Sequence, residues 1–139
     1  MGTRSHAPLI RLARFKVEEL QKQMGEIERA RTSIHDQIDR LEESVPEEQA
    51  TAMENRDGYL AYGSYARSVI QRKDKLRLSL EEVDAQASEL RGRLEAAFAD
   101  LKKYELLEER RLSRMQDALR QAEQAEMDEI ASQIRQRAQ

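Results

Sequence analysis

The sequence predicts an all-α protein in which two long helices form an antiparallel coiled-coil hairpin, with the second helix longer and overhanging the first. Charged residues make up 37% of the 139 residues and aromatic residues only 4%, which leaves too few large apolar groups for a globular core. Apolar residues recur at alternating intervals of three and four along two long segments, which is typical of a coiled coil. A strong turn signal separates these two segments.

The first helix is expected over about residues 8–45. Pro8 suits the first turn of a helix, where its missing N–H group would have no partner. From Ile10 the alternating steps reach an apolar residue at every position except Arg31, over about five heptads. The expected seam of this helix consists of Ile10, Ala13, Val17, Leu20, Met24, Ile27, Arg31, Ile34, Ile38, Leu41 and Val45.

A kinked or loop region is expected at residues 46–58. Pro46 kinks or breaks a helix, although the stretch after it could resume as a short helix because Pro and acidic residues suit a helix start. The stretch NRDGY, residues 55–59, is the strongest turn signal in the chain. Its Asn, Asp and Gly residues tolerate a left-handed backbone.

The second helix is expected over about residues 59–136, which contain no proline. The same alternating steps meet one charged residue, Lys73. The expected seam consists of Tyr59, Tyr62, Ala66, Val69, Lys73, Leu76, Leu80, Val83, Ala87, Leu90, Leu94, Ala97, Leu101 and Tyr104. Both helices together form one coiled-coil domain over residues 1–139.

Folding the chain at Asp57 pairs the two seams along their whole length, for example Ile10 with Tyr104. A shift by one heptad would match the apolar pattern as well, so the position of the turn selects this register. It pairs the two charged seam residues with apolar ones, Arg31 with Val83 and Lys73 with Leu41.

The two charged seam residues have two readings. Such residues can fix the register of a coiled coil at some cost in stability. Their long stems can also extend outward to neighbouring acids, and this interpretation is favoured, with Arg31 directed toward Glu81, Glu82 or Asp84.

Beyond Tyr104 the seven-residue rhythm meets charge at Glu108 and Arg111. Since Ile10 starts the first seam and faces Tyr104, the second helix is expected to have no partner in the first helix beyond this point. Apolar residues nevertheless continue to its end. Either some of them meet residues 1–9 or are scattered exposed side chains, or this overhang is made to bury against another protein. The second interpretation is favoured.

The sequence contains no recognisable catalytic, cofactor-binding or metal site. It has no cysteine, its five glycines form no phosphate-binding loop, and His6 and His35 lie far apart. Positive and negative residues are interleaved without the basic stripe typical of nucleic-acid binding. No apolar stretch approaches the roughly 20 residues that span a bilayer. A soluble cytoplasmic protein that is not an enzyme is therefore expected.

Three stretches resemble the FliJ family of flagellar export proteins in their order and spacing. They are LIRLARFKVEELQKQMGEIERAR, residues 9–31, then KKYELLEERRLSRM, residues 102–115, and EMDEIASQIR, residues 126–135. The resemblance covers nearly the whole chain. It implies a cytoplasmic component of the flagellar type III export apparatus, peripherally associated with the basal body.

The resemblance also implies partners. Proteins of this family are similar in shape to the central stalk of rotary ATPases, bind the export ATPase hexamer, promote its assembly and link it to the cytoplasmic domain of the export gate. They also bind export chaperones. The partner-binding residues expected on the overhang are Leu106, Leu107, Arg110, Arg111, Leu112, Met115 and Leu119.

The alternative function is a generic coiled-coil adaptor or an export chaperone of another secretion system, with its contacts at the hairpin turn. Prefoldin-like chaperones also use antiparallel helical hairpins, but they need β-strands between the helices. The connecting segment PEEQATAMENRDG is too acidic and too poor in β-branched residues to form strands.

Overall fold

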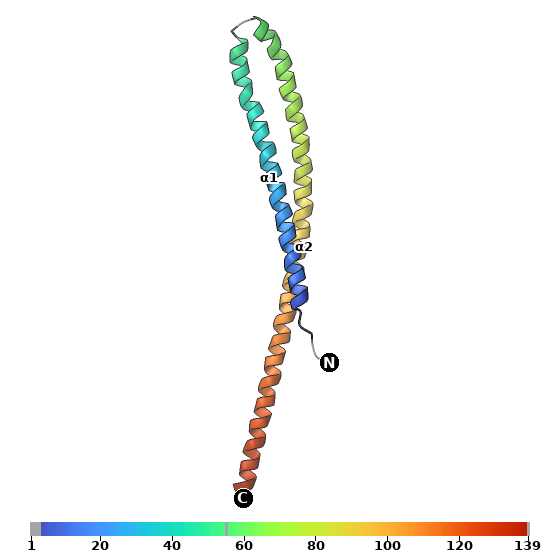
Figure 1. Cartoon of the computed structure of the whole chain (residues 1–139), viewed down its shortest axis with the longest axis vertical. Coiled ribbons are helices and arrows are strands. Elements are labelled where there is room, and N and C mark those ends of the chain that lie inside the picture. Colours follow the sequence, from blue (N-terminus) through green and yellow to red (C-terminus); the bar gives the residue numbers. More distant parts are fainter. Residues whose placement is uncertain (1–3, 55, 139) are drawn as a thin grey trace. The chain divides into compact units, whose positions relative to one another are not determined.

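The computed structural model describes residues 4–54 and 56–138, and these residues form two α-helices and no strand. Helix α1 spans Ala7–Ala52 and helix α2 spans Arg56–Ala138 (Figure 1). The helices pack against each other in opposite directions, and α2 is the longer. The predicted all-α antiparallel hairpin is confirmed.

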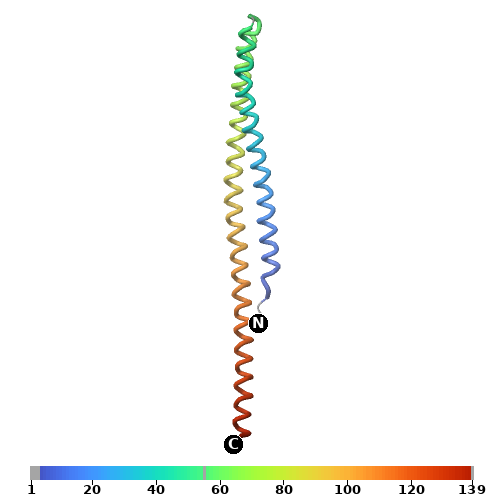
Figure 2. Tube along the Cα trace, turned by 90° about the vertical axis from the view of Figure 1, so that its left-hand side faces the viewer, coloured from blue at the N-terminus to red at the C-terminus, as the bar shows by residue number. Residues whose placement is uncertain are grey.

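The contacts divide the chain into two compact units, which are described separately. Unit 1 consists of Met1–Val17 and Ala96–Gln139, and unit 2 consists of Glu18–Glu95. Each unit contains one stretch of α1 and one stretch of α2 that runs in the opposite direction. The trace in Figure 2 follows α1 from blue to green and α2 from green to red.

In unit 2 the helices meet along the seam that the apolar periodicity describes. Leu20, Val69, Ala87 and Leu90 are buried, and the remaining seam positions are at least half-buried, apart from Tyr59. The residues between the seam positions are almost all exposed. Burial of this narrow apolar stripe, at roughly 25 cal/mol per Å² of apolar surface, holds the two helices together.

The charged seam residues of unit 2 show the register directly. Arg31 donates from Nη2 to Asp84 at 2.7 Å, one residue beyond its predicted partner Val83. Lys73 pairs with Glu42 at 2.9 Å, one residue beyond its predicted partner Leu41. Both pairs fit the predicted register, since a shift by one heptad would move each partner by seven residues. The prediction that Arg31 extends toward a neighbouring acid is correct.

In unit 1 the buried residues are small. Ala13, Val17 and Ala97 are buried, while Leu101 and Tyr104 are half-buried opposite them. Short side chains allow the two helices to approach closely at this level. Arg14 also lies 4.0 Å from Glu105 across the helix pair, but both side chains are exposed, so this ion pair contributes little.

The end of α1 differs from the predicted boundary at residue 45, because the helix continues through Pro46. The start of α2 differs from the predicted boundary at residue 59, because the helix begins at Arg56. Pro46 is exposed, as is Glu42, whose carbonyl group loses its usual N–H partner to the proline. Water can satisfy this carbonyl group on the exposed side of the helix. The continued helix brings Ala52 into the buried seam.

The predicted turn at residues 55–59 also differs. Helix α2 begins at Arg56, so Asp57 and Gly58 lie in its first turn, where the carboxylate of Asp57 favours a helix start. No described residue has a left-handed backbone. The chain leaves α1 through Met53 and Glu54, whose N–H groups bond to Gln49 and Thr51. Asn55, the first residue of the predicted turn, lies outside the described residues.

Candidate partner-binding surface

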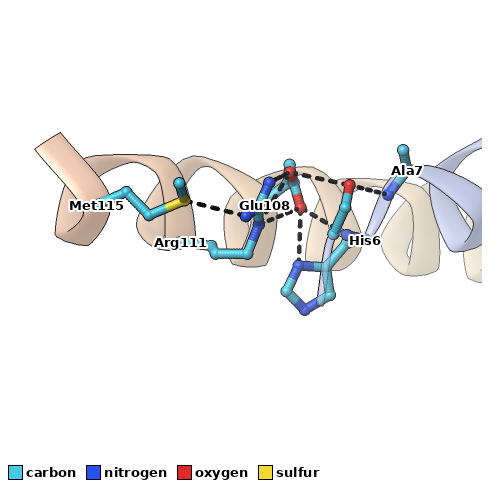
Figure 3. Close-up of polar contacts among 6 residues, drawn as sticks. His6, Ala7, Glu108, Arg111 and Met115 are labelled. Carbon is cyan, nitrogen blue, oxygen red and sulfur yellow. Dashed lines mark hydrogen bonds and ion pairs between the residues drawn. The ribbon is translucent and has the colours of Figure 1, made fainter. Parts of the chain in front are cut away.

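The start of α1 is held by a carboxylate from α2. The first N–H groups of a helix have no partner within it and carry a partial positive charge. Glu108 Oε2 accepts a hydrogen bond from the backbone N–H of His6 at 2.6 Å and another from His6 Nδ1 at 2.9 Å (Figure 3). Ser5 Oγ accepts the N–H of Ala7 at 3.1 Å and donates to Glu108 Oε1 at 3.3 Å. Glu108 therefore caps α1 from the opposite helix.

A guanidinium group compensates the charge of this carboxylate. Arg111 Nη2 donates to Glu108 Oε1 at 2.6 Å, and both side chains are largely shielded from solvent. The hydrogen bonds from Arg111, followed by that from the His6 backbone, lower the pKa of Glu108 from 4.5 to about 2. The hydrogen bond to Glu108 in turn raises the pKa of Arg111. Arg111 Nη1 also lies 3.1 Å from Met115 Sδ (Figure 3).

This arrangement, which we call the capping cluster (Ser5, His6, Glu108 and Arg111), explains the charge in the seam. Glu108 and Arg111 follow Leu101 and Tyr104 at seam spacing and are half-buried, as seam residues are. They lie opposite the start of α1. The backbone N–H groups there need a hydrogen-bond acceptor, which an apolar residue could not provide. The expectation that α2 has no partner within the chain beyond Tyr104 is wrong for Glu108, because Ser5 and His6, before α1, bond to its carboxylate.

The capping cluster makes stability sensitive to acid. Because the pKa of Glu108 in the folded protein, about 2, lies below its ordinary value of 4.5, its contribution is fully present above about pH 4.5. That contribution is lost as the pH falls from there through about 2. We expect Glu108→Gln to lower the melting temperature at neutral pH and to reduce the further loss on acidification, as measured by circular dichroism melts across this range.

Glu109→Gln is the matched control, because it removes an exposed carboxylate from the same turn of α2. Its melting temperature should follow that of the unmodified protein at each pH. Equal pH profiles for the Glu108 variant and the unmodified protein would show that Glu108 does not act as a cap.

Beyond the capping cluster, the described part of α2 is almost entirely exposed. Residues 112–130 and 132–138 are all exposed. Large apolar side chains recur among them, although a solvated helix does not need them. They are Leu112, Met115, Leu119, Met127, Ile130 and Ile134.

The predicted partner-binding residues divide into three groups. Leu106, Leu107 and Arg110 line one surface recess of about 460 Å³ together with Ala99, Lys102 and Lys103. Arg111 forms the second group. It is bound to Glu108 within the chain, a role that the sequence did not predict. The third group, Leu112, Met115 and Leu119, is exposed farther along α2. Whether any of these residues binds a partner remains a prediction.

Sequence reasoning also missed His6 and Ser5. The signal available was the pair of charged residues at seam spacing, Glu108 and Arg111, opposite the start of the first helix. Such a pair indicates that the seam there meets a helix end.

The described residues contain no group of three or more His, Cys, Asp or Glu side chains placed to hold a metal ion. Within the same residues, neither helix has an apolar stretch long enough to cross a membrane.

Comparison with protein families matches residues 5–139 to the family described as "Flagellar FliJ protein". This range covers nearly the whole chain, including the capping cluster and the exposed part of α2. Neither the curated proteins nor the solved structures contain a match to the chain.

Proposed function

Since the chain belongs to the flagellar FliJ family and is a component of flagellar protein export, we propose that it acts as a non-catalytic central stalk of the export ATPase. In this role the chain binds the ATPase hexamer, promotes its assembly and links it to the cytoplasmic domain of the export gate. It works in the cytoplasm, at the base of the flagellar export apparatus, and also binds export chaperones.

The exposed end of α2 in unit 1 is the observation that supports this proposal best. Its apolar side chains are exposed, and they continue beyond the capping cluster to Ile134. A contiguous exposed apolar surface is typical of a protein-binding site. Next to it, the recess at Leu106 and Leu107 carries three cations, Lys102, Lys103 and Arg110. Apolar residues would supply binding free energy and the cations would fix orientation.

The proposed action is conformational. A helical stalk presents different side chains in different directions, whereas the subunits of a hexameric ring are alike. The stalk therefore makes unlike contacts with identical subunits and biases their conformations differently. A ligand can shift such an equilibrium only through its different affinity for each state, so stimulation of ATP hydrolysis requires state-dependent contacts with the exposed end of α2.

The test is a binding isotherm of the full chain with purified export ATPase, together with the ATP hydrolysis rate. We expect saturable binding, a larger fraction of hexamer in sedimentation, and a higher hydrolysis rate. Binding without any change in assembly or hydrolysis would reject the stalk mechanism. Absence of binding would favour an adaptor role with other partners.

A further inference from the structure

The connected ends of the two helices in unit 2 carry a second surface that the export ATPase proposal does not use. A recess of about 300 Å³ lies between the end of α1 and the start of α2, lined by Gln49, Ala52, Met53, Tyr59 and Tyr62. We call it the tip groove. Residues from both helices line it, so it depends on the packing of α1 against α2.

Large apolar side chains at this groove are left in solvent. Met53 is 86% exposed and Tyr59 is 69% exposed, and the neighbouring Leu60 is 67% exposed. Tyr59 has seam spacing, and its exposure contrasts with the burial of the seam positions that follow it. Methionine and tyrosine adapt well to a binding partner, because methionine is flexible and tyrosine combines an apolar ring with a polar hydroxyl group.

The charge around the tip groove is mainly negative. Residues 41–66 contain the acids Glu42, Glu43, Glu47, Glu48, Glu54 and Asp57, and Arg56 is the only basic residue among them. Glu42 is paired with Lys73. Within the described residues, Glu47, Glu48 and Glu54 form no ion pair, and all three are exposed. Residues 78–90 and 121–134 also carry acids without a basic residue, but neither segment lines the tip groove.

From the apolar groove and its acidic surroundings we infer that the tip groove binds a basic, amphipathic segment of another protein. A large apolar side chain of that segment enters between Met53 and Tyr59, and its Lys or Arg residues lie over Glu47, Glu48 and Glu54. Nucleic acids and anionic membranes are unsuitable occupants, because their phosphate groups would be repelled by these carboxylates. The inference is independent of the exposed end of α2 and of the export ATPase.

A designed peptide provides the probe. It is a fluorescein-labelled amphipathic helix built from Leu and Lys, and its counterpart carries Glu in place of Lys. Fluorescence anisotropy with the full chain should show binding of the Lys peptide that weakens as the salt concentration rises, since salt screens exposed charges. The Glu peptide should bind at least tenfold more weakly.

Two variants separate the apolar and the charged parts of the tip groove. Met53→Ser with Tyr59→Ser should weaken binding of the Lys peptide by about fivefold or more, as expected for the loss of central apolar contacts. Glu47→Gln with Glu48→Gln and Glu54→Gln leaves the apolar residues intact and should abolish most of the salt dependence. The matched control is Ile70→Ser with Leu78→Ser, two residues of α2 in unit 2 that are similarly exposed.

Three results would overturn the inference. The first is equal affinity of the Lys peptide for the tip variants and the unmodified chain. The second is equal loss of affinity in the control, which would indicate non-specific adsorption to any exposed apolar residue. The third is a change of oligomeric state on substitution of Met53 and Tyr59, measured by sedimentation, because the groove would then bind a second copy of the chain.

Discussion

Replacing Leu20 with alanine is expected to lower the free energy of unfolding by about 2 kcal/mol, the low end of the roughly 2–5 kcal/mol typical of a packed core. Leu20 lies in the seam of unit 2 and is only 8% exposed. Truncation removes apolar contacts and leaves a gap that neighbouring side chains fill incompletely. The low end applies because two helices enclose a seam less completely than a globular core encloses its interior. Urea denaturation followed by circular dichroism measures the change.

Leu78→Ala is the matched control, because Leu78 lies in the same unit but is 66% exposed. Its substitution removes the same atoms from a side chain that is mostly in water already. Its free energy of unfolding should stay within about 0.5 kcal/mol of the unmodified value, as for most surface changes. If Leu78→Ala costs as much as Leu20→Ala, the seam is not the source of stability.

Substituting both Leu107 and Met115 with alanine is expected to weaken binding to the export ATPase hexamer by about tenfold or more. The side chains are 37% and 47% exposed, and they flank the capping cluster on α2. Binding free energy usually concentrates in a few large residues, each worth about 2 kcal/mol or more. Stimulation of ATP hydrolysis should fall with binding. An isotherm and a hydrolysis rate measure both effects.

The fold of this double variant is checked by its helix content and melting temperature, which should be nearly unchanged. Ile70→Ala with Leu78→Ala provides the control for exposed apolar residues in unit 2, and it should bind the ATPase normally. Normal binding by the Leu107 and Met115 variant, with its fold intact, would assign the contact to another surface. A loss of helix content would instead place both residues in the fold.

Most of the hairpin follows from local pattern. The seams starting at Ile10 and ending at Tyr104 repeat at the spacing of a coiled coil, and the structure buries or half-buries these positions apart from Tyr59. The register follows from the same pattern once a turn is placed, and the Arg31–Asp84 and Lys73–Glu42 pairs agree with it. The sequence predicts these positions because side chains on one face of a helix recur at a fixed spacing.

The helix ends were less predictable, because they depend on packing between helices. Pro46 has a strong local preference to end a helix, yet α1 continues through it and buries Ala52 beyond it. Asp57 and Gly58 favour a turn in isolation, but they also fit the first turn of α2. In neither case does the local signal alone fix the end of the helix.

By itself the sequence determined that this protein is a two-helix coiled coil with a longer second helix, because apolar periodicity needs no partner to be recognised. Only the tertiary structure decided what the charges at Glu108 and Arg111 do. Their role depends on His6, about a hundred positions away in the sequence, whose N–H group lacks an acceptor within α1 and meets a carboxylate from α2. A hydrogen bond between distant residues leaves no periodic trace in the sequence, so its partners become visible only when the helices are placed side by side.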